Sequence, residues 1–534
     1  MKDGKQRSQW GQFAALVFGS FIAIEAMVFQ APAIPSISEH FQLPTYLAGL
    51  IILSFYIAST ALYPVMGRVA DQLGRKRVLL FGMSIFAISE FAAALSPSFS
   101  FFLGARVIQG FAVACILPVA IAYIGTIFPP EKRGMATGIL SAVQAVASMT
   151  GAVIAGYLVQ QYGWPIIYWI SGALSIIGFV VVKVFVEEAK GNGTRSFDFL
   201  GVLLLIITTG CMLSVSTLVK SFGISSPYTL GTLGLGVVAA ISLWVAENKM
   251  ANPIVELSLL KRRLFAMVVI INLLVIAAFQ AFIYSMNFFI STKPGGDVVE
   301  VGLFYMVIYG GSAVGGLIFG KLADKINNKK LVLSILLIPI LTIFIFSFID
   351  TQTPFSYISM FAFILGFSQG AITPIFIKYA LSEIPPAQYG AGSGLFSTIR
   401  DFGAPFGSVT GILIFSTFTD FFTKSSLLSQ AKQAGIDSNF MGAVEQARLS
   451  EGKVTDQGLV TELQSLGIKI EDLLSTASGE GLSFAIQNIS YIVIGLFIIT
   501  FILSLFIPGT KVEKVERIQK IELEIDNLDS KTSI

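Results

Sequence analysis

The chain has 534 residues and a net charge of +3, with 54% hydrophobic but only 13% charged residues. Soluble globular proteins carry about a quarter charged residues, so this composition excludes a cytosolic enzyme, a disordered scaffold and a disulfide-stapled secreted domain. Two cysteines and one histidine provide neither a disulfide framework nor a metal site, and the small net charge does not indicate a nucleic-acid partner, which leaves a membrane protein.

Fourteen mostly apolar stretches are long enough to cross a membrane as helices, for which about 20 residues are needed. They lie at 12–33, 46–66, 78–96, 99–125, 134–158, 165–186, 198–218, 227–246, 265–290, 298–320, 331–349, 355–380, 392–417 and 484–507. We therefore predict an all-α integral membrane protein with fourteen transmembrane helices.

The loops that follow the even-numbered spans hold most of the basic residues, as at 75–77, 132–133 and 261–263. Lysine and arginine are retained on the cytoplasmic side of a membrane. We therefore predict a multi-pass protein of the cell membrane (the inner or plasma membrane) with both termini in the cytoplasm.

Two segments lie outside the predicted spans. Residues 418–483 are polar and of mixed charge, and the span count places them on the outer face. Their glycine-punctuated stretches indicate short amphipathic helices, and an accessory protein of an export assembly is a partner that this loop would suit. Residues 508–534 form a cytoplasmic tail with apolar residues at heptad-like spacing, which we interpret as a surface helix.

The two halves of the chain contain an internal repeat. The segment Gly67–Arg77 after the second span shares its glycine, its aspartate and its terminal basic pair with Gly320–Lys330 after the tenth span. Gln109–Gly110 in the fourth span likewise matches Gln369–Gly370 in the twelfth span. Two parallel repeats around a central pathway are a known carrier architecture. We predict six-helix bundles at 1–190 and 261–507, with two inserted helices at 191–260.

Several of these motifs resemble one family of carriers. Gly67–Arg77 resembles the cytoplasmic-loop signature of the major facilitator superfamily at every defining position, and Arg106–Gly110 resembles its arginine motif in the fourth span. Residues 252–257 and 397–403 are similar to sequences of the fourteen-span drug:proton antiporters of the EmrB/QacA type. The resemblance covers essentially the whole chain. It implies the major facilitator fold and proton-coupled transport, with no cofactor besides the proton.

Two positions depart from that family pattern. The fifth-span motif of the family has Gly-Pro followed by Gly-Gly, whereas this chain has alanine in place of the proline and of one glycine within Gly151–Gly156. The acid of the first span is usually an aspartate with a nearby hydroxyl residue, whereas this chain has Glu25 followed by Ala26 and Met27.

Ionisable residues at mid-membrane cost roughly 3 kcal/mol or more, so each one is a candidate for function. Glu25, Arg400 and Asp401 lie near that depth in their spans. A carboxyl group poised between desolvation and a nearby arginine can exchange a proton for a cationic substrate. The alternative is a permanent ion pair that fixes helix packing. The predicted proton-coupling residues are Glu25, Glu90, Arg106, Arg400 and Asp401, of which Arg106 rests on the family motif.

The loop motif has a mechanical interpretation. Asp71 at a helix end can pair with arginines or face the positive N-terminus of a helix from the other half. The family resemblance implies that such a contact holds the cytoplasmic side shut. The predicted gating residues are Gly67, Asp71, Gly74 and Arg75, with Asp324 as the weaker equivalent in the second half.

A polar stripe in the ninth span indicates a substrate cavity, because Gln280, Tyr284 and Asn287 recur on one helix face. A mostly apolar cavity with a few amides and acids suits small amphipathic molecules, including cationic ones. Ordinary hydrogen bonding between helices is the alternative. The predicted substrate-binding residues are Phe29, Gln144, Gln280, Tyr284, Asn287 and Gln369.

Together these features predict a monomeric, proton-coupled exporter of lipophilic compounds, a multidrug efflux protein that works by alternating access. A lipid or siderophore carrier on the same fold, without obligatory proton coupling, is the alternative. The expected partners are a small amphipathic substrate and the lipid bilayer, with no nucleic acid. The sequence contains no nucleophile–base pair, phosphate-binding loop or metal-ligand cluster, so we do not expect an enzyme.

Overall fold

The computed structural model describes residues 8–128, 130–189, 198–223, 225–250, 257–322, 328–381, 389–449 and 456–507, and these residues are almost entirely helical. The long helices are α1 (Gln9–His40), α2 (Gly49–Leu73), α3 (Arg75–Ala94), α4 (Phe99–Ile127), α5 (Pro130–Tyr162), α6 (Pro165–Phe185), α7 (Phe199–Phe222), α8 (Pro227–Lys249), α9 (Arg263–Thr292), α10 (Val298–Leu322), α11 (Asn328–Phe346), α12 (Phe355–Leu381), α13 (Tyr389–Gln433) and α16 (Ile470–Leu505). Shorter elements are η1 (Thr45–Ala48), η2 (Leu257–Lys261), η4 (Ser438–Phe440), α14 (Met441–Leu449) and α15 (Gln457–Leu466).

Each of the fourteen long helices overlaps one of the fourteen predicted spans, which confirms the predicted all-helical membrane fold. Within the described residues, 11 helices are long and apolar enough to cross a membrane, and shorter apolar helices lie at Gly49–Tyr63 and Leu200–Met212. The predicted surface helix at 508–534 lies outside the described residues.

The predicted ends of the last two spans are wrong. Helix α13 continues past residue 417 to Gln433, and α16 begins at Ile470 rather than at 484. Hydropathy detects the segment that lipid would surround, whereas a helix continues wherever its next turns can bury an apolar face. Here the extra turns of both helices bury such a face outside the apolar bundle.

The extra turns of α13 and α16 form, with α14 and α15, a small helical unit that we call the cap. Its core contains Leu427 of α13, Val444 of α14 and Leu459 of α15, which are all fully buried. The carboxylate of Glu445 on α14 forms ion pairs with Lys424 at 3.4 Å and with Arg448 at 3.1 Å. The short amphipathic helices predicted for this segment are therefore confirmed.

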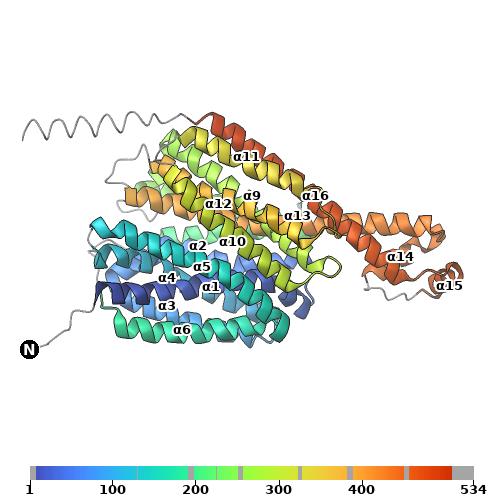
Figure 1. The fold of residues 1–534 in the computed structure, drawn as a ribbon, viewed down its shortest axis with the longest axis horizontal. Coiled ribbons are helices and arrows are strands. Elements are labelled where there is room, and N and C mark those ends of the chain that lie inside the picture. The colour runs from blue at the N-terminus through green and yellow to red at the C-terminus, as the bar shows by residue number, and fades with distance from the viewer. Residues whose placement is uncertain are drawn as a thin grey trace, which may run out of the picture.

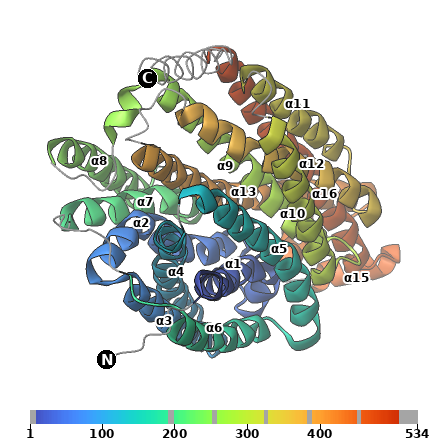
Figure 2. The same ribbon diagram turned by 60° about the vertical axis from the view of Figure 1, so that its left-hand side comes forward.

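The helices pack as two groups with an inserted pair. Helices α1–α6 pack on one another, and so do α9–α13 and α16, while α7 and α8 pack together and α7 also contacts α2 and α13 (Figure 2). The start of α1 and the end of α16 lie at one end of the molecule, which we call the termini end, and the cap projects from the opposite cap end (Figure 1). The predicted boundary at 190/191 falls outside the described residues.

The repeated Gln-Gly pair occupies equivalent places in both groups. A Cβ atom on Gly110 would overlap the carbonyl oxygen of Phe55 on α2, and one on Gly370 would overlap the carbonyl oxygen of Ser312 on α10. Helices α4 and α2 thus touch backbone to backbone, as do α12 and α10. Only glycine permits this approach, so the repeat seen in the sequence reflects a repeated helix contact.

The two groups meet at a seam in the cap-end half of the molecule. A Cβ atom on Gly302 of α10 would lie 2.6 Å from the carbonyl oxygen of Ala152 on α5. Nearby, Gln160 Nε2 donates a hydrogen bond of 2.9 Å to Asp297 Oδ2. On the other side of the seam, Gly49 at the start of α2 packs against Val409 of α13. The cap-end half is therefore closed in this structure.

Candidate functional site

Glu25 lies at the middle of α1, on the face that this helix turns toward α5. Its side chain is buried, and a Cβ atom on Gly151 of α5 would lie 3.1 Å from Glu25 Cγ and 3.3 Å from the Phe29 ring. No hydrogen bond or ion pair joins the Glu25 carboxylate to another residue in the described part of the chain. An isolated acid in this position costs free energy when it is ionised, so Glu25 is a group whose charge a proton or a cation would neutralise.

Arg106 of α4 is held in a polar cluster inside the first group of helices. The residue is 1% exposed, and its guanidinium donates hydrogen bonds to the side-chain oxygens of Gln30 on α1 and Gln109 on α4. The same guanidinium lies 4.7 Å from the centroid of the Phe55 ring, within the range of a cation–π contact. Glu90 of α3 is also buried and interacts electrostatically with Arg106. The structure therefore brings two of the predicted proton-coupling residues, Glu90 and Arg106, together.

The Arg106 cluster is linked to the second group of helices through α1. Gln30, which accepts from Arg106, precedes Ala31, and the Ala31 carbonyl accepts a hydrogen bond of 2.6 Å from Asn287 Nδ2 on α9. Asn287 Nδ2 also lies 3.5 Å from the Tyr305 hydroxyl oxygen of α10. The buried Oδ1 atom of Asn287 has no hydrogen-bond partner in the described residues. A short chain of polar contacts thus crosses from α4 to α9.

A group of tyrosines lies beside this crossing. The rings of Tyr284 and Tyr305 have their centroids 6.3 Å apart, and Tyr305 stacks on Tyr309 at 6.0 Å. These rings form a largely buried cluster of aromatic faces and hydroxyl groups, which are the groups that bind flat or cationic ligands.

Sequence reasoning missed Gln30, Tyr305 and Tyr309. Tyr305 and Tyr309 are four residues apart in the tenth span, and the same i, i+4 rule that selected the ninth-span stripe would have found them. Gln30 gave no comparable signal, because its role depends on where α4 places Arg106.

The remaining predicted residues lie on four different helices. Gln144 of α5, Gln280 of α9 and Gln369 of α12 are half-buried, and Gln369 Oε1 has no hydrogen-bond partner in the described residues. Arg400 of α13 is half-buried as well. The side chain of Asp401 and the whole of Asp324 lie outside the part of the chain that the structure describes, so their placement stays a prediction.

The loop between α2 and α3 forms a second polar site, at the termini end. Gly74 joins the two helices with φ of 105°, a conformation that favours glycine. Arg75 Nη1 donates a hydrogen bond of 2.7 Å to the Ala122 carbonyl of α4, and Arg75 N donates one of 3.0 Å to the Ala189 carbonyl. Arg75 therefore anchors the loop within its own group of helices.

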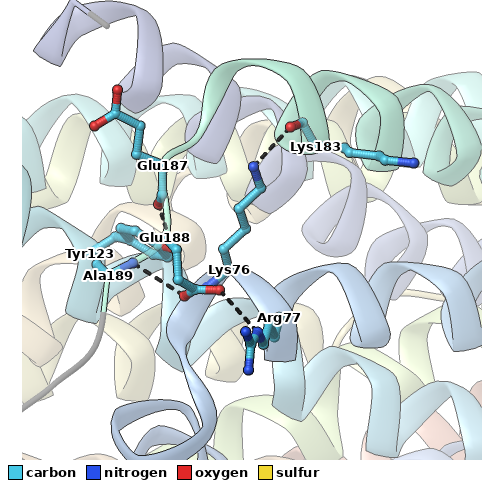
Figure 3. Close-up of polar contacts among 7 residues, drawn as sticks. All are labelled: Lys76, Arg77, Tyr123, Lys183, Glu187, Glu188 and Ala189. Carbon is cyan, nitrogen blue, oxygen red and sulfur yellow. Dashed lines mark hydrogen bonds and ion pairs between the residues drawn. The ribbon is translucent and has the colours of Figure 1, made fainter. Parts of the chain in front are cut away.

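Glu188, just after α6, closes this site from the other side (Figure 3). Its carboxylate accepts a hydrogen bond of 3.0 Å from Lys76 N and lies 3.8 Å from Arg77 Nε. Lys76 Nζ donates a bond of 2.8 Å to the Lys183 carbonyl, so the α3 start is tied to the α6 end at two points. The sequence analysis did not identify Glu188, because an acid in a loop is indistinguishable from any solvated charge.

Two predicted gating residues remain without assigned contacts. The side chain of Asp71 lies outside the described part of the chain. A Cβ atom on Gly67 would meet nothing within 4 Å, so this glycine faces open space in the present state. No group of three or more acid, histidine or cysteine side chains suited to a metal ion occurs among the described residues. Glu25 offers an isolated buried carboxyl group, and the Arg106 cluster offers polar and cation–π contacts.

Comparison with known proteins agrees with this architecture. The family model described as Major Facilitator Superfamily matches residues 16–408. Multidrug resistance protein 3 of Bacillus subtilis (strain 168) is 26% identical over 375 residues, covering 69% of this chain and 72% of that protein. The Tetracenomycin C resistance and export protein of Streptomyces glaucescens is 22% identical over 487 residues, covering 91% of this chain and 90% of that protein.

Among solved structures, the chain is similar to a bacterial homolog of the human lysosomal transporter Spinster in an inward-facing and unoccupied conformation. The TM-score is 0.62 at 16% sequence identity, with 94% of this chain and 98% of the other covered. This likeness concerns the fold alone.

Proposed function

The chain belongs to the major facilitator superfamily and is a multi-pass membrane transporter rather than an enzyme, and we propose that it is a proton-coupled exporter of lipophilic compounds, cationic ones included, that works by alternating access. Within the family we assign it to the fourteen-span drug:proton antiporters of the EmrB/QacA type. The names of its distant relatives, which include multidrug resistance and antibiotic export proteins, support an export function.

The observation that carries this proposal is the position of Glu25. The carboxyl group is buried where α1 packs on α5, inside the first group of helices, and it has no hydrogen bond or ion pair in the described residues. A proton and a cationic substrate would compete for this one group, which is the minimum requirement for exchange. Arg106 lies in the same group of helices, where its hydrogen bond to Gln30 ties α4 to α1.

If one carboxyl group binds either the proton or the cation, the exchange ratio is one to one, and this ratio determines the driving force for transport. One proton that enters for each monovalent cation that leaves moves no net charge, so the pH gradient alone drives the exchange. Each tenfold proton gradient then supports a tenfold substrate gradient, about 1.4 kcal/mol. A neutral substrate would differ, because each proton would also gain about 2.3 kcal/mol per 100 mV of membrane potential.

The proposal is tested by transport in proteoliposomes with tetraphenylphosphonium as substrate and a pH-sensitive dye inside. Substrate addition should move protons in the wild type, and Glu25→Gln should abolish this coupling. Glu39→Gln is the matched control, because Glu39 lies on the same helix but is exposed at its cap end. Asp401→Asn tests the second predicted acid. Normal proton coupling in both Glu25→Gln and Asp401→Asn would contradict the site assignment.

A lipid or siderophore carrier on the same fold is the second candidate, and aromatic side chains such as those of Tyr284 and Tyr305 suit such cargo equally. Flux that is indifferent to a pH gradient would favour this candidate over an antiporter. We further propose that both termini are cytoplasmic in the cell membrane, as the basic loops indicate. In that orientation the cap faces outward, where it is the surface available to an accessory protein. Deleting 430–475 would then spare flux in liposomes and reduce export from cells.

A further inference from the structure

Helix α1 contains two prolines in its cap-end half, Pro32 and Pro35. Proline has no N–H group, so each one leaves the carbonyl oxygen four residues before it without its usual donor in the helix. These carbonyls belong to Val28 and Ala31. Ala31 is buried, and a buried carbonyl that accepts no hydrogen bond is unfavourable. The Ala31 carbonyl therefore needs a donor from outside its own helix.

That donor comes from the other group of helices. Asn287 Nδ2 of α9 donates a hydrogen bond of 2.6 Å to the Ala31 carbonyl oxygen. The Tyr305 hydroxyl oxygen lies 3.5 Å from the same nitrogen, at the limit of hydrogen-bond distance, so the Ala31 carbonyl is the main partner. Asn287 is fully buried. Its predicted role is substrate binding, but in this state its amide group joins two helices.

The bond depends on the cap end being closed. Gln30, the neighbour of Ala31, is held by Arg106 of α4, which belongs to the same group of helices as α1. This contact can persist when the two groups separate, whereas the bond from Asn287 crosses between the groups and breaks. In the open state water reaches the Ala31 carbonyl and replaces the lost donor. The bond therefore stabilises the closed state alone.

We propose that Asn287 and Pro35 together form a closing contact of the cap end. Pro35 removes the helix's own donor from the Ala31 carbonyl, and Asn287 supplies a donor from the other group. Pro35 is a positioning residue, because it acts through the Ala31 carbonyl. The inference goes beyond the exchange of a proton for a substrate, and it rests only on the part of the proposed function in which the two groups separate at the cap end.

The distance between the two groups at the cap end measures this contact. Spin labels are attached through Tyr162→Cys at the end of α5 and Gln352→Cys between α11 and α12, which are both exposed positions. Cys115 and Cys211, the only natural cysteines, are replaced by alanine. Double electron–electron resonance then gives the ratio of open to closed molecules, because opening lengthens the distance between the labels.

Asn287→Leu keeps the branched shape of the side chain but has no donor, so the Ala31 carbonyl is left unsatisfied in the closed state. The ratio of open to closed molecules should rise between about fivefold and about 150-fold, as expected when one buried polar group loses its partner. Ser285→Ala is the matched control, because the buried Ser285 hydroxyl donates to the carbonyls of Ala281 and Gly411 within its own group. An unchanged ratio in a folded Asn287→Leu variant would overturn the proposal.

The role of Pro35 is tested by rescue. Pro35→Ala restores an N–H group four residues after Ala31, so the carbonyl regains a donor inside α1 and no longer depends on Asn287. In this background Asn287→Leu should raise the ratio less than about twofold. Pro32→Ala restores a donor for the Val28 carbonyl instead, so in that background Asn287→Leu should keep its full effect. Equal effects of Asn287→Leu in both proline variants would contradict the assignment of Pro35.

Proton coupling separates this inference from the proposed function. The wild type is assayed with tetraphenylphosphonium and an internal pH-sensitive dye beside the distance measurement. If the ratio shifts as expected but the substrate moves no protons, the closing contact stands and the antiport proposal fails. If the substrate moves protons but the ratio does not respond to Asn287→Leu, the closing contact fails and the antiport proposal stands.

Discussion

The seam between α5 and α10 makes a quantitative prediction about alternating access. Gly302 of α10 packs directly on the backbone of α5, and the same glycine lies near Gly156. Alternating access requires the two groups of helices to separate at the cap end, because this end is closed in the present structure. Gly302→Ala adds one methyl group at the contact and should therefore favour the state in which the contact is broken.

The size of the shift follows from the geometry. The new Cβ atom would lie 2.6 Å from the Ala152 carbonyl oxygen and 3.3 Å from Val153 Cα, which are backbone atoms that cannot swing aside. Overpacking of this kind costs about 1–3 kcal/mol. The gain in helix propensity from Gly to Ala is common to both states and cancels between them. At about 1.4 kcal/mol per tenfold, the population of the open state should rise between about fivefold and about 150-fold.

Labelling of a single cysteine measures this shift. Cys115 and Cys211 are the only cysteines in the chain, so both are replaced by alanine and Ala31→Cys is added, since Ala31 is buried where α1 meets α9. The rate of labelling by a membrane-impermeant maleimide should rise in Gly302→Ala. It should not rise in Gly104→Ala, because a Cβ atom on Gly104 meets nothing within 4 Å. Equal labelling rates in two folded variants would refute the reasoning.

Three further predictions follow from other contacts. Gly74→Ala should lower the melting temperature more than Gly223→Ala. Both substitutions strain a residue of positive φ by about 1–2 kcal/mol, but only the new Cβ atom at Gly74 would also meet a carboxylate oxygen, that of Glu188 at 2.7 Å. Equal losses of melting temperature in a thermal shift assay would contradict this prediction. Burial raises the pKa of the Glu445 carboxyl, but Arg448 and the neighbouring lysine outweigh burial and hold that pKa below its ordinary value. The ion pairs of Glu445 should therefore stabilise the cap at neutral pH and lose this effect as the pH falls below about 4.3, the ordinary pKa of a glutamate. Amide hydrogen exchange of residues 441–449 should become faster over this pH range in the wild type, and the Glu445→Gln variant should lack this pH dependence. Transport of a monovalent cation should also be unchanged when a potassium diffusion potential is imposed at constant pH gradient; flux that follows the potential would exclude one-for-one exchange.

Much of the fold was predictable from the sequence because membrane insertion depends on local properties. Each span is a run of apolar residues that lipid must surround, and its presence can be read without knowing its neighbours. The duplicated Gln-Gly pairs were equally readable, since a backbone contact between helices demands glycine at one place in each half. Glu25 and Arg106 also stood out, because ionisable groups are rare within apolar spans.

The sequence failed where the outcome depends on a partner outside the segment. From hydropathy alone, the last two spans were predicted to end where the apolar residues end. In the structure α13 and α16 continue into the cap, because residues such as Leu427 are buried there. The sequence also offered no reason to select Gln30 or Glu188, whose significance comes from Arg106 in one case and from Arg77 in the other.

The sequence by itself therefore determined that this chain is a bundle of membrane helices built from two related halves, with acids and an arginine inside it. Only the tertiary structure decided which of those charges have partners: Arg106 is bound on three sides, whereas Glu25 has no hydrogen bond or ion pair among the described residues. The physical reason is that hydropathy acts on each segment separately, whereas a charge inside the membrane is satisfied only by the rotation and register of neighbouring helices. Those are set by packing across the whole bundle.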